Sequence, residues 1–78
     1  MRNEEIAEAV RRFGRKAREK HRDSQKKAMG AWKTLKGVLR EDELLQLGVA
    51  WDHVKIEGAC ELDDVVSRVA SRYSTARA

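Results

Sequence analysis

Apolar side chains recur at helical spacing through the first half of the chain. Ile6, Val10, Phe13 and Ala17 follow one another at intervals of four, three and four residues, which predicts a buried stripe along an amphipathic helix. The same phase continues to residue 39 through His21, Ser24, Ala28, Trp32, Leu35 and Leu39. The pattern therefore predicts helix from about residue 4 to residue 39, as one continuous helix or as two helices that stay nearly in line.

The middle of this stripe favours a break. His21, Ser24 and Ala28 bury little apolar area, so at about 25 cal/mol per Å² they attach the segment to a core less strongly than Phe13 does. Asp23 and Ser24 are also good N-terminal caps. Both versions remain open, and in the broken one the two helices part near Asp23–Ser24.

Two shorter helices are predicted in the second half. Gly37 and the acids at 41–43 indicate a helix boundary. The next stripe follows at intervals of three, four and three residues, and its members are Leu44, Leu47, Trp51 and Val54. A short alternation over 54–58 predicts an extended link that ends in a turn. The last helix has its apolar positions at Leu62, Val65, Val66, Val69 and Tyr73.

These elements predict an all-α fold, a small helical bundle with a long basic N-terminal helix or helix pair and two shorter C-terminal helices. The chain has 78 residues, no proline and no linker, which indicates a single domain. Its parts are a basic amphipathic region at 1–40, an acidic helical region at 41–73 and a frayed tail at 74–78. A chain this short buries only about 60% of its unfolded surface, a limit that a homodimer would relieve.

Charge is distributed unevenly between the two halves. Residues 1–40 contain thirteen Lys or Arg and five Asp or Glu, whereas residues 41–78 contain four and eight. Such asymmetry is typical of proteins whose basic part binds a polyanion. It would equally let the two halves of neighbouring copies attract each other, and the totals do not separate these interpretations.

The basic side chains lie mainly along one line of the predicted helix, opposite its apolar stripe. The candidate phosphate-contacting residues are Arg11, Arg12, Arg15, Arg18, Arg22, Lys26, Lys33 and Lys36. We call these eight residues the basic line. At about 1.5 Å rise per residue, Arg11 to Arg22 spans roughly 16 Å, enough to meet several phosphates. The other two interpretations are a solvated helix face and a surface that meets an acidic protein.

Part of the second half resembles a known family of DNA-binding domains. Leu47-Gly48-Val49 followed by Val54 is similar to the turn of helix-turn-helix proteins. The resemblance covers about fifteen residues and implies a recognition helix after the turn. Leu44 stands where that family usually has a small residue, and the following helix carries Asp52 and Glu57, so no base-contacting residues are assigned from it.

Enzymatic and metal chemistry are not predicted. Cys60, His21 and His53 match no zinc spacing, and neither a Gly-rich phosphate loop nor a nucleophile motif is present. We expect no cofactor. Trp32 and Trp51 lie on apolar stripes, which favours core packing over base stacking. A single cysteine and the absence of a signal-peptide pattern predict a cytoplasmic protein, and no apolar run is long enough to span a membrane.

The sequence thus predicts a small nucleic-acid-binding regulatory or accessory protein that contacts phosphates through the basic line. The acidic helices would supply the core and a dimer interface. The alternative is a non-enzymatic inhibitor or adaptor of the phage or plasmid type, which binds a protein in a larger nucleic-acid-handling complex. Salt dependence separates the two, because phosphate contacts weaken steeply with salt and an apolar contact does not.

Overall fold

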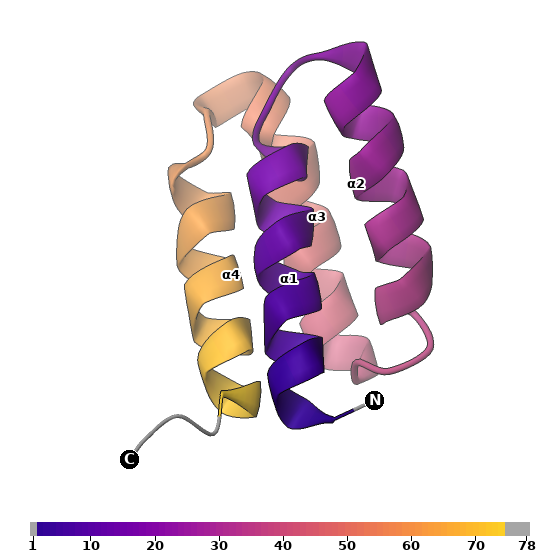
Figure 1. The fold of residues 1–78 in the computed structure, drawn as a ribbon. Coiled ribbons are helices and arrows are strands. Elements are labelled where there is room, and N and C mark those ends of the chain that lie inside the picture. Colours follow the sequence, from indigo (N-terminus) through magenta and orange to yellow (C-terminus); the bar gives the residue numbers. More distant parts are fainter. Residues whose placement is uncertain (1, 75–78) are drawn as a thin grey trace.

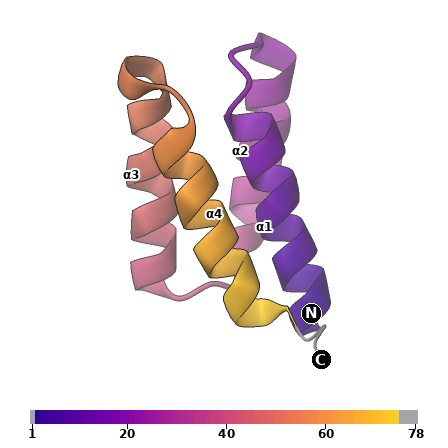
Figure 2. The ribbon, with the colours of Figure 1, turned by 90° about the vertical axis from the view of Figure 1, so that its left-hand side faces the viewer.

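The computed structural model describes residues 2–74 as a bundle of four helices in up-down-up-down order (Figures 1 and 2). The helices are α1 (Asn3–Ala17), α2 (Arg22–Leu35), α3 (Glu41–Glu57) and α4 (Cys60–Tyr73). Helix α1 packs against α2 and α4, and α3 packs mainly against α4. The predicted all-α bundle is confirmed. Of the tail predicted at 74–78, Ser74 lies just after α4 and is not helical, and residues 75–78 lie outside the described residues.

The N-terminal half folds as two helices that lie side by side (Figure 1). The chain reverses at residues 18–21, a few positions earlier than the predicted break, and the expectation of helices in line is wrong. Asp23 and Ser24 lie in the first turn of α2, and His21 occupies the N-cap position. Small buried residues on both sides of the loop, Ala17 and Ala28, let the two helices approach closely.

Gln25 links the loop between α1 and α2 to helix α3. Its side-chain nitrogen donates hydrogen bonds to the carbonyl oxygens of Ala17 (3.1 Å) and Glu19 (2.5 Å). Its side-chain oxygen accepts a hydrogen bond from Trp51 Nε1 at 3.0 Å. Carbonyl groups at a helix end have no partner within the helix, so Gln25 satisfies the end of α1 while it holds α3 in place.

Three aromatic rings fill the centre of the bundle. The Phe13 ring centroid lies 5.6 Å from that of Trp32 and 5.1 Å from that of Trp51, and the two indoles are 5.9 Å apart. Phe13 is fully buried and both tryptophans are half-buried. The tryptophans therefore pack the core, as the sequence predicts, in the tilted and edge-on geometries that aromatic pairs prefer.

The second half of the chain differs from the sequence-based prediction at residues 54–58. Helix α3 continues to Glu57, so the extended link predicted at 54–58 is wrong. Only Gly58 and Ala59 separate α3 from α4, and Gly58 has φ of 89°, a backbone conformation that costs a glycine little. Val54 and Glu57 are therefore both helical, and the chain enters a tight turn immediately after Glu57.

The helix-turn-helix resemblance is also corrected. Leu47, Gly48 and Val49 lie inside α3 and form no turn. A methyl group on Gly48 would come within 3.3 Å of Trp32, so this glycine leaves room for the indole ring. The glycine therefore lets a large side chain of α2 pack directly on α3.

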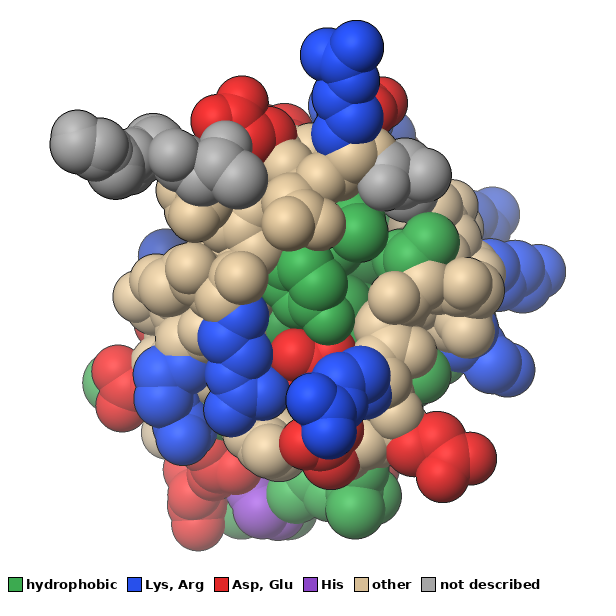
Figure 3. Space-filling view, turned by 90° about the horizontal axis from the view of Figure 1, so that it is seen from below, with side chains coloured by type: hydrophobic (Ala, Val, Ile, Leu, Met, Phe, Trp, Pro, Cys, Tyr) green, Lys and Arg blue, Asp and Glu red, His purple; other side chains and the backbone are tan. Residues whose placement is uncertain are grey.

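A buried carboxylate, that of Glu43, lies between the two helices of the α3–α4 hairpin. Glu43, whose side chain is only 2% exposed, accepts hydrogen bonds from Tyr73 Oη (2.5 Å), Arg72 Nη1 (3.2 Å) and the backbone N–H of Arg40 (3.0 Å). Figure 3 shows the end of the bundle where α1 begins and α4 ends, with apolar side chains in the middle of this face and basic and acidic ones around its edge. Glu43 links the start of α3 to the last turn of α4.

The contact between α1 and α4 depends on a residue without a side chain. A Cβ atom at Gly14 would lie 2.7 Å from Val66 Cγ2, closer than atoms can approach. Valine in a helix has one strongly preferred rotamer, so it cannot easily move away. We expect Gly14→Ala to lower the free energy of unfolding by about 1–2 kcal/mol, because overpacking outweighs the gain in helix propensity.

Denaturant unfolding followed by circular dichroism measures this effect. Gly30→Ala is the matched control, because a Cβ atom at that exposed position of α2 has no neighbour within 4 Å. It should stabilise the protein by about 0.5–1 kcal/mol through helix propensity alone. Equal stabilisation by both substitutions would contradict the close packing of α1 on α4.

Candidate nucleic-acid interface

The hairpin of α1 and α2 divides the basic line into parts with different surroundings. All eight of its residues are exposed. Arg11, Arg15 and Arg18 lie on the side of α1 that faces α4, where they border an open groove that includes Val66 and Ser67. Lys36 borders a groove between α2 and α3 instead. Since α2 turns back along α1, the residues that share one line in the sequence pattern do not share one face.

The arginines on the α4 side of α1 have acidic partners. Glu8 lies 3.8 Å from Arg11 and 3.5 Å from Arg15, and Asp63 of α4 lies 3.5 Å from Arg18. All of these side chains are about half exposed. Exposed pairs of this kind contribute at most about 1 kcal/mol each, but they reduce the positive charge that this face presents.

The cations of α2 have no such partners. Among residues 2–74, neither Arg22, Lys26, Lys33 nor Lys36 forms an ion pair. We call these four residues the α2 basic face. Residues 20–36 hold six Lys or Arg and a single acid, Asp23, whereas residues 2–18 hold six and three acids. The stronger positive field therefore surrounds α2 rather than α1.

Arg12 occupies a third position, in an open groove between α1 and α2. It lies there with Lys27, a cation that the sequence analysis did not select, and with Glu5 and Glu8. The floor of the groove contains small residues such as Gly30. Mixed charges make this groove a weaker polyanion site than the α2 basic face.

Glu19 brings negative charge to the loop between the two helices. A hydrogen bond from Ser24 Oγ lowers the pKa of this carboxyl group, and the positive charges of Lys16 and Lys27 act in the same direction. Glu19 is therefore ionised at neutral pH. Its negative charge offsets part of the positive charge of Arg18 and Lys20 in this loop.

Comparison of the chain with protein-family models, with curated proteins and with solved structures gave no match. Within the described part of the chain, none of the helices combines the length and apolar character needed to cross a membrane. The functional interpretation therefore depends on the surfaces themselves, namely the α2 basic face and the apolar residues exposed on α3.

Proposed function

We propose that this protein is a small, cytoplasmic, non-enzymatic nucleic-acid-binding protein that contacts phosphates through the α2 basic face. The observation that carries the proposal is that these four exposed cations have no acidic partner among the described residues. From Arg22 to Lys36 the helix rises about 21 Å, a length that meets several successive phosphates. A regulatory or accessory role in DNA or RNA transactions fits a protein of this size.

The arginines of α1 take a supporting part in this proposal. Their ion pairs with Glu8 and Asp63 are exposed and 3.5–3.8 Å long, so a phosphate can replace the carboxylate at small cost. Arginine also donates two parallel hydrogen bonds to a phosphate, which lysine cannot do. Arg11, Arg15 and Arg18 therefore extend the contact once α2 has bound.

The test is binding of the full chain to a generic DNA duplex and to a structured RNA at about 50 and 200 mM salt. For duplex DNA, the logarithm of affinity should fall with the logarithm of salt by about 0.9 per phosphate neutralised. A slope that corresponds to four or more contacts supports the proposal. Absence of binding to both nucleic acids at the lower salt concentration refutes it.

A second candidate function, protein binding, is favoured by the outward face of α3. Leu45, Val49 and Ile56 are 68%, 41% and 81% exposed and lie on one side of the helix, opposite the buried Leu47 and Val54. A helix that is apolar on both faces is usually buried on both. We call these three exposed residues the α3 apolar stripe.

We propose that a second copy of the chain covers the α3 apolar stripe. The adjoining groove between α2 and α3 is lined by Trp32 and Trp51 and has Lys36 on one edge and Glu41 and Asp52 on the other. A two-fold axis would bring the basic edge of one copy towards the acidic edge of its partner. Such a dimer would use Lys36 in its interface and would present the other three cations of each α2 basic face to one nucleic acid.

Leu45→Glu combined with Ile56→Glu is expected to convert a dimer into a monomer, because charge would then be buried in the interface. Sedimentation velocity at about 100 μM protein measures the change, a concentration at which even a micromolar dimer forms. Met29→Glu is the matched control, since Met29 is also exposed (46%) but lies on α2. A monomeric wild-type protein would refute the dimer and favour an adaptor that binds another protein through this stripe.

A further inference from the structure

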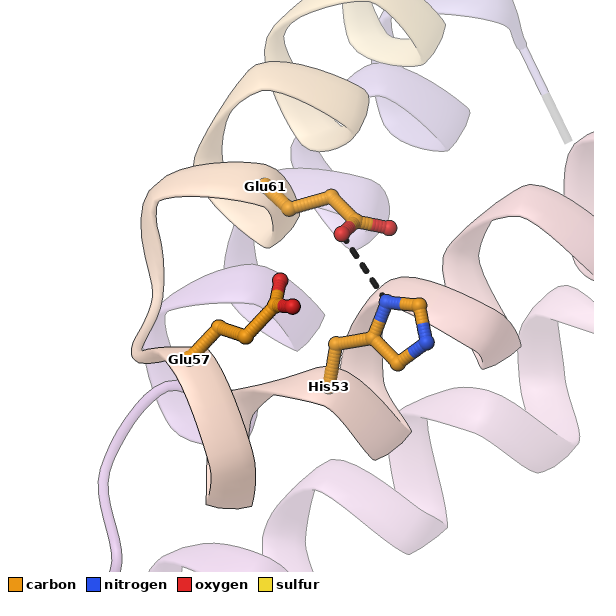
Figure 4. A group of neighbouring side chains, drawn as sticks. All are labelled: His53, Glu57 and Glu61. Carbon is orange, nitrogen blue, oxygen red and sulfur yellow. Dashed lines mark hydrogen bonds and ion pairs between the residues drawn. The ribbon is translucent and has the colours of Figure 1, made fainter.

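Three metal-binding side chains meet where α3 turns into α4. His53 and Glu57 lie one helical turn apart near the end of α3, and Glu61 lies in the first turn of α4 (Figure 4). One donor atom from each of them, a ring nitrogen or a carboxylate oxygen, lies within 4.8 Å of the other two. The turn at Gly58 brings Glu61 back over His53, which the spacing in the sequence does not reveal.

Two of the donor atoms already face each other. His53 Nδ1 and Glu61 Oε1 lie 2.9 Å apart and form a hydrogen bond and ion pair (Figure 4). Two ligands that bind one Zn²⁺ at about 2.0–2.2 Å and at the tetrahedral angle are about 3.4 Å apart, so the ion would replace this hydrogen bond after the two side chains separate by about half an ångström. The side chains of His53 and Glu61 are both 40% exposed, and Glu57 is exposed, so rotation of the Glu57 side chain can bring in the third ligand without a backbone change.

The chemistry of the donors selects the kind of ion. Two carboxylates carry enough charge to balance a divalent cation, and Asp52 adds further negative charge close to His53. An imidazole nitrogen suits zinc and neighbouring transition metals, whereas magnesium and calcium prefer ligand sets made of oxygen alone. This negative cluster occurs in a protein with a formal net charge of +4.

We propose that His53, Glu57 and Glu61 bind one divalent transition-metal ion, for which Zn²⁺ is the best match. The sequence predicts no metal site, because it offers only His21, His53 and Cys60 as nitrogen and sulfur ligands at unsuitable spacings. The site in the fold uses two carboxylates in their place, and water would complete the coordination. The bound ion would connect the end of α3 to the start of α4 and stabilise their hairpin.

Isothermal titration of the full chain with ZnCl₂ at about pH 8 tests the proposal, because the hydrogen bond to Glu61 raises the pKa of His53 above its ordinary value and metal binding needs the neutral imidazole. We expect one ion per chain with a micromolar dissociation constant, and a thermal midpoint that rises by several degrees and returns after EDTA is added. His53→Ala and Glu61→Gln should each weaken binding by at least about tenfold. Circular dichroism of both variants establishes that they remain folded.

Two control variants identify the ligands. His21→Ala removes the other histidine, which is exposed in the loop between α1 and α2, and Cys60→Ser removes the exposed thiol beside Glu61. Both should bind Zn²⁺ as the wild type does. The proposal is overturned if the wild-type protein shows no saturable binding below about 1 mM, if folded His53→Ala binds as the wild type does, or if either control loses binding.

Discussion

Glu43→Gln is expected to lower the free energy of unfolding by about 2–3 kcal/mol. The carboxylate is 2% exposed and accepts hydrogen bonds from Tyr73, Arg72 and the backbone of Arg40. Hydrogen bonds to a buried charged group contribute about 1.5–3 kcal/mol, and an amide replaces one acceptor oxygen by a donor that faces other donors. The loss stays below that of a fully buried ion pair, since Arg72 is 49% exposed and can be hydrated again.

Urea unfolding followed by circular dichroism measures this difference. Glu41→Gln is the matched control, because Glu41 is an exposed acid on the same helix and its loss should change stability by less than about 0.5 kcal/mol. Tyr73→Phe should remove about 1–2 kcal/mol, the contribution of one hydrogen bond to the carboxylate. Equal stability of the Glu43 and Glu41 variants would show that the buried network contributes nothing.

The effect of Glu43 depends on pH. Burial by itself would raise the pKa of this carboxyl group, but the hydrogen bonds from Tyr73, Arg40 and Arg72 outweigh burial and lower it. A lowered pKa in the folded state means that the stabilisation is complete above the unfolded-state value of about 4.3 and is lost as pH falls through the folded-state value. The difference between wild type and Glu43→Gln should therefore shrink in acid. Burial and the bond to Glu43 raise the pKa of Tyr73 to about 12, so its hydroxyl remains a donor throughout.

Replacement of the α2 basic face by glutamine is expected to abolish most nucleic-acid binding. The variant combines Arg22→Gln, Lys26→Gln, Lys33→Gln and Lys36→Gln. If each cation neutralises one phosphate of duplex DNA, the salt slope should decrease by about 3.6, and affinity at about 50 mM salt should fall at least about 100-fold. Fluorescence anisotropy with a labelled duplex measures both quantities.

The matched comparison is the triple variant with Arg11→Gln, Arg15→Gln and Arg18→Gln. These arginines already share Glu8 and Asp63, so each should contribute less per charge than a cation of α2. We expect a smaller decrease in slope per substitution. A larger effect of the α1 variant would show that the nucleic-acid interface lies at the groove between α1 and α4. If neither variant changed binding, the phosphate-contact proposal would be wrong.

Periodicity alone predicted much of the secondary structure and core. Ile6, Val10, Phe13 and Ala17 are buried as their spacing indicates, and the last helix buries Leu62, Val65 and Val69. The pattern failed at His21, which continues the apolar phase but lies exposed in a loop. When the apolar periodicity continues across a loop, it predicts which face of each helix is buried. It does not distinguish one continuous helix from two antiparallel helices.

The candidate sites were less predictable, because each depends on residues from separate elements. The pairing of Arg18 with Asp63 joins α1 to α4, and the bonds of Glu43 join the start of α3 to the end of α4. Glu43 was one of three consecutive acids expected to favour a helix start, and of its three bonds only the one from the N–H of Arg40 is local. Its burial follows from the position of Tyr73, thirty residues away.

The helical class, the buried faces of most helices and the excess of positive charge in the first forty residues follow from the amino-acid sequence, because they depend on side-chain spacing and composition, which are local. The α1–α2 hairpin, the division of the basic line into paired and unpaired residues and the contact of His53 with Glu61 follow only from the tertiary fold. Those outcomes depend on how the loop at 18–21 and the turn at Gly58 reverse the chain. A reversal brings residues that are distant in the sequence into contact, and it places residues of one sequence pattern on different faces of the bundle.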